Sequence, residues 1–182
     1  SRSFVKSYIY QLYTRMASLD CVTNNTAGSG VTLSISTGNN LSTNSGSGAS
    51  MASGVFSDTA IINRSDDYGI QVGTGNTAVT TSDYALQTRV DNGTASGELE
   101  FMGGDYYSNY TESNPNASFD IERIFRNASG GSIVVAEIGI YSSSYASIYY
   151  SFCICRDVLG ATVTVANGEY LKVKYTFQIS VS

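Results

Sequence analysis

Apolar and polar residues alternate along most of the chain after residue 55. In the clearest run, residues 170–181, one face carries only apolar side chains: Leu171, Val173, Tyr175, Phe177, Ile179 and Val181. This period of two predicts a strand with one buried face. Similar runs between turns rich in Gly, Asn and Asp predict strands at residues 68–72, 84–90, 97–102, 119–126, 133–141, 148–155 and 162–166.

Turn signals separate these runs. Asn167-Gly168, which precedes the last run, is the dipeptide preferred by a two-residue type I′ hairpin, because both central residues of that turn have a positive φ. Short strands at regular spacing, with no helical pattern between them, indicate an antiparallel β-sandwich or a barrel-like domain. The fold class is therefore expected to be mainly β.

The N-terminus has a helical period instead. Its apolar residues recur at i, i+1, i+4 and i+5, which predicts one amphipathic helix with the stripe Phe4, Val5, Tyr8, Ile9, Leu12, Tyr13 and Met16. This stripe can pack on its own domain or dock on a neighbouring subunit. A helix on a membrane surface is the third alternative, although the segment has few cations for binding anionic lipid.

A polar segment follows the predicted helix. Of the 27 residues at 24–50, 21 are Gly, Ser, Thr or Asn. The segment therefore has too few apolar residues for their burial to offset the entropy cost of ordering it. Within it, Val31, Leu33 and Ile35 alternate as in a short strand. We therefore divide the chain into an N-terminal helix at 1–20, a flexible arm at 21–54 and a β-sandwich domain at 55–182.

Composition excludes several kinds of chemistry. The 182 residues include 28 Ser and 17 Thr but no His, so histidine-based triads and histidine-ligated metal sites are ruled out. Ten Lys and Arg against 15 Asp and Glu give a net charge of −5, and their scatter argues against a nucleic-acid groove. No apolar run is long enough to predict a membrane span.

Two polar motifs fit structural roles at least as well as sites. Gly73-Thr74-Gly75 lacks the other residues of a phosphate-binding loop and predicts a turn. Glu98 and Glu100 share one face of a predicted strand, as the paired carboxylates of a glycosidase could, but two glutamates on a solvent face need no such role. We expect no enzymatic activity, no cofactor, no metal and no small-molecule ligand.

Three cysteines, Cys21, Cys153 and Cys155, fall one ligand short of a closed zinc site in a chain without histidine. On a strand, Cys153 and Cys155 would share a face, opposite Phe152 and Ile154, in a geometry poorly suited to a disulfide between them. One of them can pair with Cys21, pinning the arm to the sheet, or with another chain. Alternatively, all three are free thiols that act as small strand residues.

Tyrosines crowd the region around residues 106–110. Tyrosine offers a large contact area with a polar tip, which suits protein contacts; glycan stacking and ordinary strand packing are the alternatives. Together with the helix stripe, these tyrosines form a candidate assembly interface: Phe4, Tyr8, Ile9, Leu12, Tyr13, Met16, Tyr106, Tyr107 and Tyr110.

Three stretches, taken in order, are similar to poorly characterised virion proteins of tailed bacteriophages and prophages. They are residues 68–79 (YGIQVGTGNTAV) with 83–86 (DYAL), residues 119–141 with the internal NASGG and EIGIY, and residues 154–169 with ICRDVL and VTVANGE. The resemblance covers about residues 67–181 and omits the polar arm. It implies a β-sandwich structural protein of a particle and no catalytic residues.

These observations predict a non-enzymatic subunit of a tailed-phage virion, in its capsid surface, tail or connector. Such a subunit would assemble with its own copies and with other virion proteins through the helix, the arm and exposed β edges. Two alternatives remain. One is a subunit of an extracellular bacterial or archaeal filament joined by strand donation, and the other is a β-sandwich adhesin or carbohydrate-binding module.

Overall fold

The structure, a computed structural model, describes residues 3–4, 21–24, 26–33, 69–103, 106–107, 111–146 and 148–180. Within these ranges the chain forms antiparallel strands and no helix, which confirms the mainly β fold class. The strands are β1 (Ser3–Phe4), β2 (Cys21–Asn24), β3 (Gly30–Leu33), β4 (Gly69–Gly73), β5 (Glu100–Phe101), β6 (Tyr106–Tyr107), β7 (Thr111–Ser113), β8 (Asn116–Arg126), β9 (Ile133–Ala146), β10 (Ile148–Val165) and β11 (Tyr170–Ser180).

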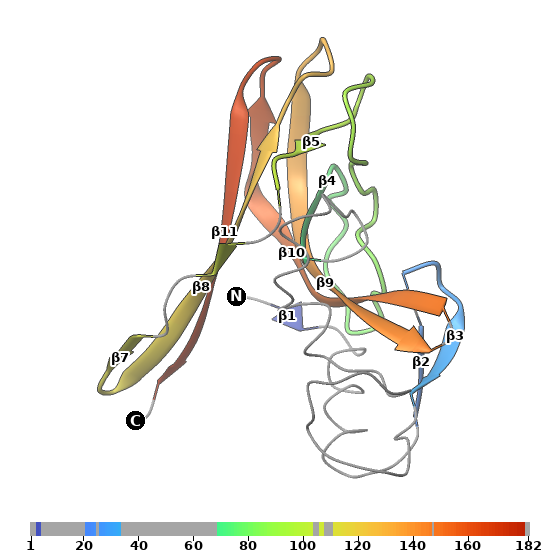
Figure 1. The fold of residues 1–182 in the computed structure, drawn as a ribbon, viewed down its shortest axis with the longest axis vertical. Coiled ribbons are helices and arrows are strands. Elements are labelled where there is room, and N and C mark those ends of the chain that lie inside the picture. The colour runs from blue at the N-terminus through green and yellow to red at the C-terminus, as the bar shows by residue number, and fades with distance from the viewer. Residues whose placement is uncertain are drawn as a thin grey trace.

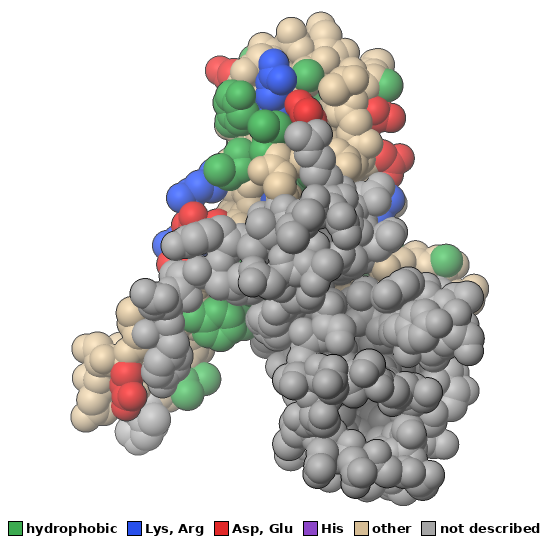
Figure 2. Space-filling view, viewed as in Figure 1, with side chains coloured by type: hydrophobic (Ala, Val, Ile, Leu, Met, Phe, Trp, Pro, Cys, Tyr) green, Lys and Arg blue, Asp and Glu red, His purple; other side chains and the backbone are tan. Residues whose placement is uncertain are grey.

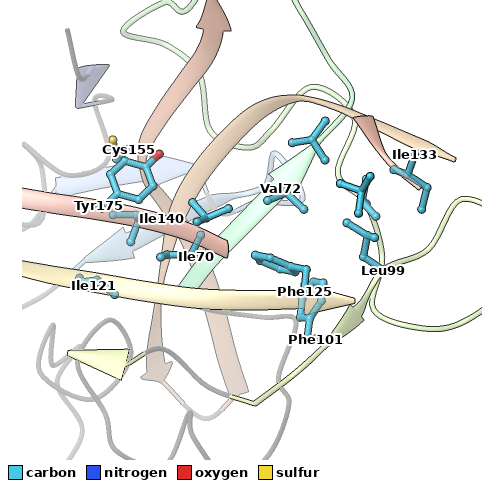
Figure 3. Close-up of a cluster of buried hydrophobic side chains, with 14 of the residues drawn as sticks. Ile70, Val72, Leu99, Phe101, Ile121, Phe125, Ile133, Ile140, Cys155 and Tyr175 are labelled. Carbon is cyan, nitrogen blue, oxygen red and sulfur yellow. The ribbon is translucent and has the colours of Figure 1, made fainter. Parts of the chain in front are cut away.

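Two of the sheets share one hydrophobic core (Figure 1). The first sheet has the order β1-β10-β9-β4, and the second has the order β11-β8-β5, with β6 and β7 also paired with β8. Strands β2 and β3 form a separate hairpin. The core draws on both larger sheets, and Figure 3 shows most of it: Ile70, Val72, Val90, Leu99, Phe101, Ile121, Phe125, Ile133, Val135, Ile140, Ile154, Cys155, Val165, Val173 and Tyr175.

The second sheet has two unlike edges. On one side of β8, the strands β5, β6 and β7 pair in turn with its residues, so they form a single edge in three short pieces. On the other side, β11 pairs with β8 without interruption from Tyr170↔Arg126 to Ser180↔Asn116. Among the strands that the structure describes, β8 is the only neighbour of β11.

The outer ends of β8 and β11 leave the rest of the sheets and run outward as a ribbon, with β7 beside them (Figure 1). This changes the expected burial of the last strand. Val173 and Tyr175 are buried as predicted, but Phe177 is half-buried and Ile179 is 69% exposed. The alternation is correct as a strand pattern, but it does not reveal where the core ends.

Three strand predictions need correction. Residues 84–90 form no strand; one isolated bridge, Gly73↔Arg89, joins them to β4. The two runs at 148–155 and 162–166 belong to one strand, β10. Asn167-Gly168 makes a turn, closed by the Glu169 N–H donating to the Ala166 carbonyl at 3.0 Å, but β10 and β11 enter different sheets, so the predicted hairpin is wrong.

The N-terminal residues Ser3 and Phe4 form β1 and pair with Arg156 and Cys155 at the edge of β10. Phe4 is therefore in a strand, not in the predicted helix. Residues 5–20 lie outside the described part of the chain, so the helix itself stays a prediction.

Part of the predicted arm is a β-hairpin. Val31 and Leu33 lie in β3, as their alternation predicts, and pair with residues of β2. In the turn of this hairpin, the Thr26 N–H donates to the Ser151 carbonyl of β10 at 2.9 Å. The hairpin is thus hydrogen-bonded to the first sheet.

Candidate functional site

Among the described residues, a polar cluster lies where residues 74–90, the covering segment, contact the first sheet. At its centre is Glu137 of β9, which has no exposed surface. Its Oε1 accepts hydrogen bonds from the backbone N–H groups of Gly75 at 3.1 Å and Thr88 at 2.8 Å. Its Oε2 accepts from the Gln87 N–H at 3.1 Å and from Arg156 Nε at 2.8 Å. One carboxylate therefore satisfies three backbone donors of the covering segment.

Arg156 of β10 connects this carboxylate to a second one. Its Nη1 donates to Asp83 Oδ2 at 2.7 Å, and its Nη2 donates to the Thr77 carbonyl at 3.1 Å. The side chain is 2% exposed, whereas Asp83 is 20% exposed. Because a buried guanidinium needs several acceptors, this arrangement fixes the covering segment to β10 at two points.

Two glycines allow the close approach. A Cβ on Gly75 would lie 2.5 Å from Glu137 Oε1, and a Cβ on Gly139 would lie 3.0 Å from the Leu86 side chain and 2.9 Å from the Cys155 carbonyl. The segment Gly73-Thr74-Gly75 is not helical, and its Gly75 N–H donates to Glu137. Close packing between the covering segment and the first sheet therefore explains why glycine occupies positions 75 and 139.

Tyr141 and Cys153 lie under the same cover, packed with Leu86. The Tyr141 hydroxyl accepts a hydrogen bond from the Leu86 N–H at 2.8 Å. Burial raises the pKa of Tyr141 and of the Cys153 thiol well above their ordinary values. A buried thiol with a raised pKa is a poor nucleophile. The cluster therefore works as a clamp that holds the segment on the sheet.

The cysteines do not share a face, contrary to the sequence-based prediction. A register shift between Cys153 and Cys155 inserts one residue into β10, so Cys153 packs with Leu86 and Tyr141 while Cys155 joins the main core beside Tyr175 (Figure 3). Both are buried thiols. Cys21 lies in β2, where its side chain is outside the description.

The candidate assembly residues are only partly placed. Tyr106 and Tyr107 form β6 and pair with Glu122 and Ile121 in the interrupted edge of the second sheet. Phe4 lies in β1 at the edge of β10. The remaining members fall outside the described residues: Tyr8, Ile9, Leu12, Tyr13, Met16 and Tyr110.

The two glutamates considered as paired carboxylates have separate structural partners. Glu98 Oε2 accepts a hydrogen bond from the Ala95 N–H at 2.9 Å, which closes a turn. Glu100 lies 3.5 Å from Arg126 in an ion pair. Elsewhere in the described ranges, no group of three or more potential metal ligands comes together, and no helix there could cross a bilayer.

The sequence analysis missed the clamp of Glu137, Arg156 and Asp83. One signal was present, because Glu137 is the only charged residue in the apolar run at 133–141. A charge in such a run is rarely buried without a partner. Comparisons of the chain with protein-family models, curated proteins and solved structures found no match. The described part of the chain is thus a mainly β structure.

The clamp predicts acid sensitivity through Asp83. Burial raises the pKa of this carboxyl, but hydrogen bonds from Thr80 and Arg156 and the charge of Arg156 outweigh it, so the pKa lies below its ordinary value. A lowered folded-state pKa stabilises the fold above about pH 4, and this stabilisation is lost as the pH falls through the folded-state value. In urea titrations, Asp83→Asn should therefore be less stable than wild type at pH 7, with a difference that shrinks toward pH 3.

Asp91→Asn is the matched control for this experiment. Asp91 lies farther along the same connection and forms an exposed ion pair with Arg89 at 3.1 Å. Such a pair contributes little to stability, so this variant should stay close to wild type at pH 7. A difference between Asp83→Asn and wild type that is the same at both pH values would contradict the assignment.

Proposed function

We propose that this protein is a non-enzymatic structural subunit of a tailed-phage virion, in the capsid surface, tail or connector, that assembles through its predicted N-terminal helix, its arm and its β edges. The observation that carries this proposal is the ribbon of β8 and β11, which extends beyond the shared core with apolar side chains on it (Figures 1 and 2). The resemblance of residues 67–181 to phage virion proteins agrees with it.

The ribbon has the chemistry of a contact surface. Along its outer part, the apolar face of the sheet continues as cross-strand pairs, Ile179↔Ala117 and Phe177↔Phe119. The two phenyl rings stack with centroids 5.1 Å apart and an interplanar angle of 8°. The ribbon is thin, because the three-residue β7 is the only described strand that adds to β8 and β11 at its outer end. Contiguous exposed apolar surface on such an element marks an interaction site. Binding of another protein would stabilise both features.

The N-terminal segment supports a second contact. Residues 5–20 begin at β1, which pairs with Cys155 and Arg156, and end at the hairpin whose Thr26 is bonded to Ser151. Both ends of this segment are therefore held along the same edge of β10. The predicted helix lies between these two points in the sequence, and we propose that its apolar stripe contacts a neighbouring subunit.

The filament alternative has one observation in its favour. The long, continuous edge of β11 is a surface to which a donated strand from another subunit could add. Electron microscopy of purified oligomers separates the two assemblies, because a virion component should form closed rings or discrete complexes and a strand-donating filament subunit should form open fibres.

The proposal predicts that the helix stripe controls assembly. In the full-length chain, Tyr8→Asp combined with Leu12→Asp should reduce the mass measured by size-exclusion chromatography with light scattering, because two charges enter an apolar interface. The far-ultraviolet circular dichroism of the β fold should stay unchanged. The control is Gln11→Asp combined with Thr14→Asp, which places the same charges off the stripe and should leave the mass unaltered.

Two results would contradict the proposal. If wild-type protein is monomeric at every concentration, a monomeric binding module is the better explanation. If the stripe variant loses its β-sheet spectrum, the helix belongs to the core of its own domain.

A further inference from the structure

We infer that β11 is the strand through which two copies of this chain pair, so that residues 174–180 of both copies join their second sheets across a twofold axis. The inference rests on the proposed function, since it names the partner of one of the β edges. Four features carry it: the unequal edges, the charges along β11, the exposed apolar face and a self-complementary register.

The other edges of the two larger sheets are partly covered or broken. Beside β4, the Val90 N–H donates to the Val72 carbonyl at 3.0 Å and the Thr74 N–H to the Thr88 carbonyl at 2.9 Å. The edge of β10 carries β1 and the contact from Thr26. The edge formed by β5, β6 and β7 is in short pieces. Proteins commonly blunt edges in these ways, which prevents unwanted strand pairing.

Among the residues that the structure describes, none protects the outer half of β11 in these ways. It pairs with β8 over eleven successive residues with no register shift. Lys172 and Lys174 protect the inner half, and each is neutralised across the strand pair, by Glu122 and Asp120 at 2.9 Å. From residue 175 to residue 180 the strand has no charge and no proline. The outer half is thus an uninterrupted, uncharged edge of the kind that accepts another strand.

A second copy of β11 fits this edge because the pattern is compatible with itself. In an antiparallel pair centred on Phe177, Lys174 lies opposite Ser180, and Phe177 lies opposite its own copy. Directly opposite residues in such a pair project on the same face, so the apolar faces of the two ribbons become one. Ile179, which is 69% exposed, then lies opposite Tyr175.

The charges also select the register. Sliding the centre of the pair from Phe177 to Val173 would place Lys172 opposite Lys174 twice, and like charges directly opposite are destabilising. The favoured register therefore lies in the uncharged outer half. A twofold pairing of this kind is a closed interface, which joins two subunits and leaves the N-terminal contacts for further assembly.

The test compares two exposed positions of β11 in the full-length chain. Ile179→Lys introduces a charge within the proposed register, and Tyr170→Lys introduces the same side chain outside it; the native residues are 69% and 61% exposed, so neither substitution should disturb folding. Light scattering over a concentration series should show the dimer dissociation constant of Ile179→Lys raised by about tenfold or more. Tyr170→Lys should match wild type.

Hydrogen exchange locates the contact. In wild type, the backbone amides of residues 174–180 should gain protection as protein concentration rises, and in Ile179→Lys they should not. An oligomer whose mass is unaffected by Ile179→Lys, or is equally reduced by Tyr170→Lys, would overturn this inference and leave the proposed function standing. Protection that requires a different virion protein would also overturn it. A wild-type monomer at all concentrations would overturn both.

Discussion

Replacing Glu137 with glutamine should lower the free energy of unfolding by about 3–5 kcal/mol, although the two side chains have nearly the same shape. Each carboxylate oxygen accepts two hydrogen bonds, one pair from Gly75 and Thr88 and the other from Gln87 and Arg156. The amide NH₂ of glutamine would have to face one of these pairs, donor against donor. A buried donor without an acceptor carries its full desolvation cost.

The loss can be measured by urea denaturation followed by circular dichroism. Glu122→Gln is the matched control, since Glu122 pairs with Lys172 at 2.9 Å but the lysine is 57% exposed. An exposed pair of this kind should contribute about 0–1 kcal/mol. A Glu137→Gln effect as small as that of Glu122→Gln would show that the clamp does not support the fold.

A double variant tests what the clamp holds. Many buried ion pairs can be replaced by apolar residues of similar volume at no cost to stability. Here Glu137→Met combined with Arg156→Met should still be strongly destabilised, because the N–H groups of Gly75, Gln87 and Thr88 would lose their acceptor. Recovery of wild-type stability in this variant would mean that Glu137 matters only as the partner of Arg156.

The same clamp explains why one predicted strand is absent. Residues 84–90 place Tyr84, Leu86 and Val90 at alternate positions, as in a strand, but only Leu86 and Val90 of these are buried and Tyr84 is 42% exposed. The Gln87 and Thr88 N–H groups, however, donate to Glu137 and the Leu86 N–H donates to the Tyr141 hydroxyl. The Val90 N–H does bond to a strand, at the Val72 carbonyl of β4. An alternating sequence pattern carries no information on where the backbone hydrogen bonds go.

The sequence correctly predicted strands whose alternating apolar residues face the hydrophobic core. The runs that became β8 and β11 have one face against a core, so their alternation was sufficient to identify them. Asn167-Gly168 specified a turn, but the pairing of the strands on either side depends on distant residues. For the clamp, Arg156 and Asp83 are 73 residues apart in sequence, and a single sequence does not reveal such a contact.

The second large effect is expected at Phe125, at the centre of the core. Its ring is fully buried and meets Phe101 edge to face, with centroids 5.0 Å apart. The guanidinium of Arg123 lies 4.6 Å from the centroid of Phe101 and 5.9 Å from that of Phe125, and its Nη1 donates to the Ile70 carbonyl at 3.0 Å. Arg123 thus joins the second sheet to β4 while stacked on two rings.

Phe125→Ala should therefore cost about 3–5 kcal/mol, since it leaves a cavity and removes one of these stacking partners. Phe177→Ala is the matched control within the same sheet. Phe177 is half-buried and stacks on Phe119, so its removal from the monomer should cost about 1–2 kcal/mol. Equal losses in the two variants would mean that the core extends along the whole ribbon.

Protein concentration should separate the two phenylalanines further. If two copies pair through β11, Phe177 lies opposite its own copy in the dimer, so Phe177→Ala should cost more stability in concentrated than in dilute solution. Phe125 is enclosed within one subunit, and the cost of Phe125→Ala should not depend on concentration. A concentration-independent effect at both positions, measured by thermal unfolding, would place Phe177 outside any interface between copies.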